Sequence, residues 1–174
     1  THTVKRLSQG GAYKDAVLLD VGCGREMPLA KLLYSSRLIP SLYIGVDAGP
    51  IPKTTLEVFS SGRLNYVVFD NTDILDLRTS DFGDDHQVAV SPNWVTCFEM
   101  LEHVEPAHAM KVLRKIRELM TDDGTLLLST PVWDRVNTAG NHVNEMSLSI
   151  LDLMIKSAEL VPVEVYGTFA SQRD

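Results

Sequence analysis

The chain has 174 residues, a formal net charge of −7, 44% hydrophobic residues and 22% charged residues. These values are typical of a single globular domain, 1–174, with enough apolar residues for a core. No apolar run approaches the roughly 18 residues of a membrane span. Residues 1–9 are polar and basic with no apolar segment after them, so we expect no signal peptide and a cytoplasmic location. Cys23 and Cys97 are too few for a disulfide framework and predict two reduced thiols.

Acidic residues dominate the middle of the chain. Between Asp70 and Glu105 they far outnumber the single basic residue, Arg78. A surface of this sign repels phosphate backbones, so the sequence disfavours nucleic acid as a substrate.

The first predicted strand, residues 17–21, is a nearly continuous aliphatic run, which is typical of a strand buried on both faces of a parallel sheet. Gly22 and Gly24 follow it, and their missing Cβ atoms permit a sharp turn and the close approach of a ligand. Leucines at helical spacing predict a helix over 28–36. The next strand, 42–46, ends at Asp47, the position where a ribose-binding carboxylate would stand.

The remaining elements alternate in the same way. A short helical stretch is predicted between Pro50 and Gly62, followed by a strand at 66–69, an irregular connection at 79–93 and a strand at 94–98. A helix with an apolar face follows over 109–120, and then a strand at 126–128. The last predicted elements are a helix at 147–158 capped by Ser147 and a sixth strand at 161–165. Parallel neighbours need crossover connections, so this order predicts an α/β fold with a doubly wound, mostly parallel sheet. Ligands in such sheets bind at the carboxyl ends of the strands.

Several motifs together resemble the class I S-adenosylmethionine-dependent methyltransferases, in particular their ubiquinone-pathway O-methyltransferase-like branch. The motifs are LLDVGCG from residue 18, YIGVDAG from residue 43, FEMLEHV from residue 98, STP from residue 129 and HVNE from residue 142. The resemblance implies a Rossmann-like core and S-adenosylmethionine as the cofactor. A complete core of this class has a seventh, antiparallel strand, and we expect that strand to be absent from this chain.

The resemblance also implies roles for individual cofactor-binding residues. The methionine and ribose part of the cofactor would be wrapped by Asp20, Gly22, Cys23 and Gly24. Asp47 would take the ribose hydroxyls. The adenine would meet Asp73 and Ile74, with Asp70 as the alternative acid, and the methyl-bearing end would lie between Phe98 and Glu99.

Methyl transfer is an in-line displacement at a sulfonium carbon, and a hydroxyl or ammonium acceptor must also lose a proton. His103 has the chemistry of that proton acceptor, and Glu99 would share a face with it if the segment were helical. His142 and Glu145 are expected to line the acceptor side. The competing structural interpretation is that Glu102 and His103 cap the following helix, that His142 and Glu145 cap the next one, and that Asp73 caps a turn. The other histidines, His2, His86 and His108, are expected on the surface.

The preferred hypothesis is an enzyme that methylates an O or N atom of a small molecule, with no metal; the motifs define neither the acceptor nor the oligomeric state. One alternative is a metal-dependent RNA 2′-O-methyltransferase, because Glu99, Glu102, His103 and His142 match four positions that hold a divalent cation in plant-type small-RNA methyltransferases. The acidic middle of the chain argues against it. Another alternative is a non-catalytic module that binds a partner protein. A nicotinamide-dependent oxidoreductase is disfavoured because the third glycine of its fingerprint is absent.

Overall fold

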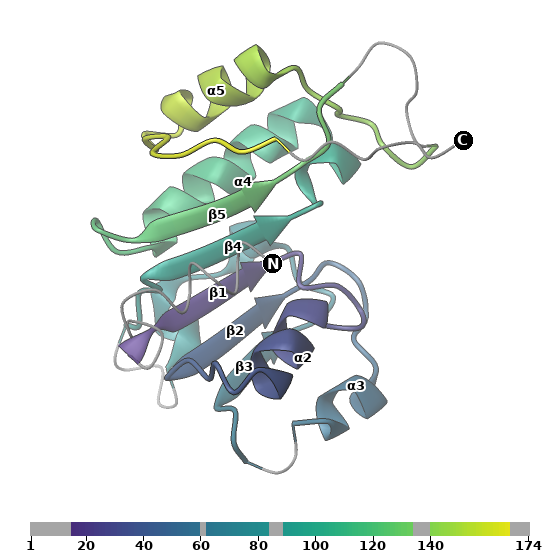
Figure 1. Ribbon diagram of the computed structural model, residues 1–174, viewed down its shortest axis with the longest axis vertical. Helices are drawn as coiled ribbons and strands as arrows, with labels where there is room; N and C mark the ends of the chain where they lie inside the picture. The colour runs from purple at the N-terminus through teal and green to yellow at the C-terminus, as the bar shows by residue number, and fades with distance from the viewer. Residues whose placement is uncertain (1–14, 60–61, 84–88, 134–139, 168–174) are drawn as a thin grey trace.

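The computed structural model describes residues 15–59, 62–83, 89–133 and 140–167. Its centre is one sheet of five parallel strands in the order β3-β2-β1-β4-β5 (Figure 1). The strands are β1 (Val17–Val21), β2 (Leu42–Val46), β3 (Tyr66–Phe69), β4 (Trp94–Phe98) and β5 (Thr125–Ser129). The chain moves outward from β1 to β3 and then returns to the other side of β1. The strand order therefore reverses between β1 and β4, and α/β sheets bind ligands beyond the carboxyl ends of the strands at such a reversal.

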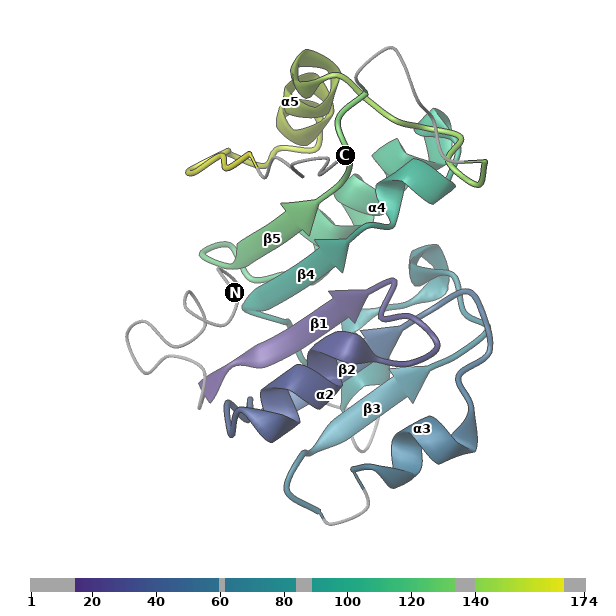
Figure 2. The same cartoon turned by 45° about the vertical axis from the view of Figure 1, so that its right-hand side comes forward.

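Helices cover both faces of the sheet, and α2 and α4 lie on opposite sides of it (Figures 1 and 2). The helices are α2 (Pro28–Ser35), α3 (Lys53–Glu57), α4 (Pro106–Leu119) and α5 (Leu148–Ser157), and short 3-10 turns occur at η2 (Ile74–Asp76), η3 (Thr79–Phe82) and η4 (Leu101–His103). The fold is therefore the doubly wound, Rossmann-like sheet that the sequence predicts. Within the described residues, no helix combines the length and apolar character needed to cross a bilayer.

The core is split into two layers because successive side chains of a strand point to opposite faces. Leu19, Ile44 and Val95 are fully buried on the side covered by α4, whereas Leu18 and Tyr43 are buried beneath α2. A strand with apolar side chains on both faces is the reason that β1, β2 and β4 appear in the sequence as continuous rather than alternating hydrophobic runs.

The five sheet strands occur where the sequence predicts them, and Ser147 caps α5 by accepting a hydrogen bond from the Ile150 amide at 3.4 Å. The predicted sixth strand at 161–165 is wrong: residues 161–167 form no strand. Val161 and Val163 are 82% and 88% exposed. Alternating valines show only that a segment could present an apolar face, and a strand also needs a hydrogen-bonding neighbour, which none of the described strands provides here.

Candidate active site

The glycine turn after β1 is held by the neighbouring strand. Gly22 and Gly24 have φ values of +70° and +73°, a left-handed conformation that side chains rarely adopt. The amides of Gly22 and Cys23 both donate to the Val46 carbonyl of β2, at 2.9 and 3.1 Å. These two amides are therefore not available to a ligand. The turn can contribute to binding because its glycines allow a ligand to approach the backbone closely.

Asp47 connects this turn to the loop after β2. Its Oδ2 accepts a hydrogen bond from the Gly24 amide and its Oδ1 accepts one from the Gly49 amide, both at 2.8 Å. Two backbone donors fix the orientation of the carboxylate, and each oxygen keeps a second lone pair. The partly exposed carboxylate can therefore accept further hydrogen bonds from hydroxyl groups of a ligand.

Asp20 lies inside the sheet rather than at its edge, and it is 3% exposed. Its two oxygens accept hydrogen bonds from the hydroxyls of Tyr43 of β2 at 2.6 Å and Thr96 of β4 at 2.7 Å. Burial raises the pKa of the Asp20 carboxyl, the two hydroxyls oppose that rise, and the nearby negative charge of Asp47 adds to it. This network is not visible in the sequence, because Tyr43 and Thr96 are ordinary strand residues until the strands are paired.

Both cysteines are free and buried. Burial is the main cause that raises the pKa of the Cys23 and Cys97 thiols, and the charge of Asp20 raises it further. The thiols are therefore held in the neutral form, as expected of reduced structural cysteines.

The loop after β3 carries the predicted adenine-binding residues. Asp73 caps η2 by accepting a hydrogen bond from the Leu75 amide at 2.9 Å, which is the structural interpretation considered above. Its other oxygen lies 3.3 Å from Nε2 of His108 in α4. His108 is partly exposed, in keeping with the expected surface position, and Asp73 is a partner that the sequence did not indicate. His2 and His86 lie outside the described residues. Ile74 is buried in the core.

A further carboxylate, Glu99, follows β4 with a positive φ of 49°. It accepts a hydrogen bond from the Ser129 hydroxyl at the end of β5, at 2.7 Å. Residues 99 and 100 are not helical, so Glu99 does not share a helix face with His103, and that sequence-based expectation is wrong. Between them, Met100 packs against Gly22, where an added Cβ would lie 2.7 Å from its Cγ. This contact places the loop after β4 directly beside the glycine turn.

Glu102 and His103 do not cap α4, whose N-cap residue is Glu105 and has no side-chain hydrogen bond. Glu102 turns inward and is 1% exposed. Its Oε2 accepts a hydrogen bond from the Thr130 hydroxyl at 3.2 Å, and its Oε1 lies 4.0 Å from His103 Nε2.

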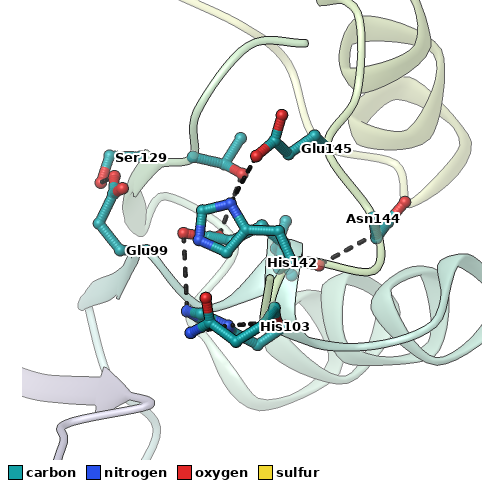
Figure 3. A network of polar contacts seen from close by, with 10 residues as sticks. Glu99, His103, Ser129, His142, Asn144 and Glu145 are labelled. Carbon is teal, nitrogen blue, oxygen red and sulfur yellow. Dashed lines mark hydrogen bonds and ion pairs between the residues drawn. The ribbon is translucent and has the colours of Figure 1, made fainter. Parts of the chain in front are cut away.

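His142 is brought to this cluster from the loop before α5 (Figure 3). Its Nδ1 lies 2.6 Å from Glu145 Oε1, and its ring meets the His103 ring edge to face with centroids 4.9 Å apart. The Glu102 backbone carbonyl anchors the loop by accepting hydrogen bonds from the Val143 and Asn144 amides at 2.8 and 3.1 Å. His142 and Glu145 thus pair with each other instead of capping α5.

The structure therefore gathers the predicted residues into two neighbouring groups at the carboxyl edge of the sheet. One group is the glycine turn with Asp47, and the other is Glu102, His103 and His142. Phe98, at the end of β4, is partly buried against the core layer beneath α2. Ser129 and Thr130 belong to the STP motif and Asn144 belongs to the HVNE motif, but the motifs give these residues no role. Only the fold shows that Ser129 and Thr130 donate to Glu99 and Glu102. It also shows that the Asn141 carbonyl oxygen lies 3.1 Å from His103 Nδ1.

Solved structures with the same fold are methyltransferases of several kinds. An O-methyltransferase family protein from Burkholderia thailandensis is 18% identical, with a TM-score of 0.65 over 92% of this chain and 50% of that chain. The 1,6-didemethyltoxoflavin N1-methyltransferase of the same organism, solved with its substrate and S-adenosylhomocysteine, is 20% identical with a TM-score of 0.62 over 91% of this chain and 68% of that chain. The small RNA methyltransferase HEN1 is 21% identical with a TM-score of 0.62 over 90% of this chain and 21% of that chain.

The chain thus spans about half the length of the first of these proteins. No curated protein matches the sequence. A family model described as a methyltransferase domain matches residues 1–159. The chain therefore belongs to the methyltransferase domain family.

Proposed function

We propose that the protein transfers a methyl group from S-adenosylmethionine to an O or N atom of a small-molecule acceptor. The observation that carries the proposal is the position of Asp47, a carboxylate fixed by two backbone amides beside a glycine turn at the point where the strand order reverses. Such a group is suited to the paired hydroxyls of a ribose. The family membership and the S-adenosylhomocysteine bound by the toxoflavin methyltransferase support the same cofactor.

In this proposal the cofactor lies across the ends of β1, β2 and β3. Asp47 takes the ribose hydroxyls, and Asp73 with Ile74 takes the adenine. The glycine turn of Gly22, Cys23 and Gly24 lies beside the methionine part of the cofactor. Asp20 stabilises the strand that precedes this turn from within the sheet. Phe98 and Glu99 flank the methyl-bearing end.

The cluster of Glu102, His103 and His142 lies on the acceptor side of this arrangement. The cofactor already carries an activated methyl group, so the protein must align the acceptor and dispose of its proton. A neutral imidazole accepts a proton near neutral pH. His142 is the better oriented of the two histidines because Glu145 holds its Nδ1 at 2.6 Å, and His103 lies against its ring.

A small-molecule acceptor is favoured by the acidic middle of the chain and by the substrates of structural neighbours such as the toxoflavin enzyme. The FEMLEHV, STP and HVNE motifs support a place near the ubiquinone-pathway O-methyltransferases. A metal-assisted RNA 2′-O-methyltransferase is the second candidate, because three of the four matching residues, Glu102, His103 and His142, converge. Repulsion between acidic residues and phosphates makes it the weaker candidate.

Calorimetric titration with S-adenosylhomocysteine and S-adenosylmethionine tests the cofactor assignment. We expect micromolar binding by the wild type and binding weakened by about 10- to 100-fold in Asp47→Ala, because charged hydrogen bonds contribute about 1.5–3 kcal/mol each. The matched control is Asp123→Ala, which removes an exposed carboxylate in the turn before β5 and should leave the affinity unchanged. Absence of binding by a folded wild type would refute the enzyme hypothesis and favour a partner-binding module.

A further inference from the structure

We propose that His108 is a positioning residue for the cofactor: from α4 it holds the Asp73 carboxylate in the orientation that recognises the 6-amino group of adenine. The Nε2 atom of His108 lies 3.3 Å from Oδ2 of Asp73, which belongs to the loop after β3. This role rests on the proposed function in one respect, the contact between Asp73 and adenine. It adds a residue from outside the predicted cofactor site.

Both oxygens of the Asp73 carboxylate have a neighbour within the protein. Oδ1 accepts a hydrogen bond from the Leu75 amide at 2.9 Å, and Oδ2 faces the His108 ring. The terminal torsion of an aspartate is broad, so a single contact leaves the plane of the carboxylate variable. The second contact, from a different element, narrows that range. Each oxygen still keeps a lone pair for a ligand.

The loop that carries Asp73 is attached to both of its neighbours. The Thr72 amide donates to the backbone carbonyl of Asp47 at 3.0 Å, so the loop is joined to the residue proposed for the ribose. Ile74 is buried in the core layer that α4 covers, which keeps the loop against this helix. The backbone of the loop is therefore fixed independently of His108, and His108 acts on the direction of the Asp73 side chain.

The chemistry of the pair makes His108 the donor. A ring nitrogen that faces a carboxylate carries a proton, because the lone pair of an unprotonated nitrogen would repel the oxygen. The side chains of His108 and Asp73 are 35% and 38% exposed. Water therefore weakens their attraction, and we expect the pair to change a binding constant by about 2- to 5-fold rather than by orders of magnitude.

A carboxylate held in one orientation distinguishes adenine from hypoxanthine. The 6-amino group of adenine donates a hydrogen bond, whereas the 6-oxo group of hypoxanthine is an acceptor and is repelled by a carboxylate. A carboxylate that rotates more freely can turn away from the oxo group. Loss of His108 should therefore weaken the discrimination between the two bases more than it weakens binding as a whole.

Calorimetric titration with S-adenosylhomocysteine and with S-inosylhomocysteine, its 6-oxo analogue, tests this role. We expect the wild type to bind the adenine compound at least about 10-fold more tightly than the analogue. His108→Ala should reduce this ratio by about 2- to 5-fold. His108→Gln, whose side-chain amide can still donate to Asp73, should restore part of the ratio. Lys111→Ala, which removes an exposed side chain on the next turn of α4, should leave the ratio unchanged.

In an Asp73→Ala background, His108→Ala should have no further effect on the ratio, because its partner is gone. An unchanged ratio in folded His108→Ala, or the same loss in both backgrounds, would overturn the role of His108. Equal binding of the two compounds by the wild type would also overturn it and would leave the methyl transfer in place. Binding of neither compound by a folded wild type would overturn both proposals.

Discussion

Gly22 combines a backbone φ of +70° with direct contact to the loop that follows β4, where a Cβ would lie 2.7 Å from Met100 Cγ. Gly62 has almost the same φ, +71°, and a Cβ there would meet nothing within 4 Å. An alanine at Gly62 would lose stability only through its left-handed backbone, whereas an alanine at Gly22 would also collide with Met100. Met100 lies between Glu99 and the histidine cluster, so a collision at Gly22 would also displace the acceptor side of the site.

We predict that Gly62→Ala lowers the free energy of unfolding by about 1 kcal/mol, the cost of a left-handed alanine. Gly22→Ala should lower it by about 2–4 kcal/mol, because overpacking against Met100 adds to that cost. Chemical denaturation measures both. Calorimetry with S-adenosylhomocysteine should show weakened binding in Gly22→Ala only, and equal stability of the two variants would contradict the packing at Gly22.

The histidine cluster shows how far single residues can be interpreted from the sequence. The motifs name Glu102, His103 and His142 as candidates of one site, and the structure brings these three together. The motifs also include Glu99 in this site, but its carboxylate accepts a hydrogen bond from Ser129 instead. The difference arises because the direction of a side chain in a non-helical loop depends on backbone angles such as φ 49° at Glu99, which residue spacing does not encode.

At the scale of elements, α4 and α5 differ in how firmly they are packed. Helix α4 buries one whole face against the sheet, with residues Ala109, Val112, Leu113, Ile116 and Leu119. Helix α5 packs against α4, but it has no buried residue, and Leu148, Ile150 and Leu153 are more than half exposed. The sequence predicts both helices, but only the fold shows that α4 packs into the core and that α5 does not.

We therefore predict that Ile116→Ala lowers the free energy of unfolding by about 2–5 kcal/mol, as expected for a fully buried side chain. Leu153→Ala, at 65% exposure in α5, should change it by less than about 0.5 kcal/mol. Urea denaturation of the two variants makes the comparison. A large loss in Leu153→Ala would mean that the exposed face of α5 is covered in solution.

A buried acid lies at the centre of the sheet. Asp20 of β1 joins β2 through Tyr43 and β4 through Thr96, so one carboxylate connects three strands. Its pKa in the folded protein is raised above the ordinary value of 3.8, chiefly by burial. A carboxyl with a raised pKa contributes its full stability below pH 3.8, where it is protonated in both states. That contribution falls as the pH rises through the folded-state pKa.

We predict that the stability of the wild type relative to Asp20→Asn decreases as the pH rises from 4 to 8, because asparagine cannot lose a proton. The decrease is about 1.4 kcal/mol for each unit by which folding raises the pKa of Asp20. Urea denaturation across this pH range measures the difference. The control Asp123→Asn, at an exposed position, should show little pH dependence relative to the wild type, and a flat difference for Asp20→Asn would contradict the raised pKa.

Local sequence patterns were enough to predict the five strands, the crossover helices and the edge of the sheet that carries the polar residues. These features follow from local rules: an aliphatic run makes a buried strand, glycines permit the turn after β1, and Ser147 caps the start of α5. Contacts between distant segments, such as Asp20 with Thr96, 76 residues apart, depend on how the strands pair. The tertiary structure also decided that residues 161–167 form no strand. The physical reason is that hydrogen bonds and burial at these positions depend on partners that only the folded chain brings near.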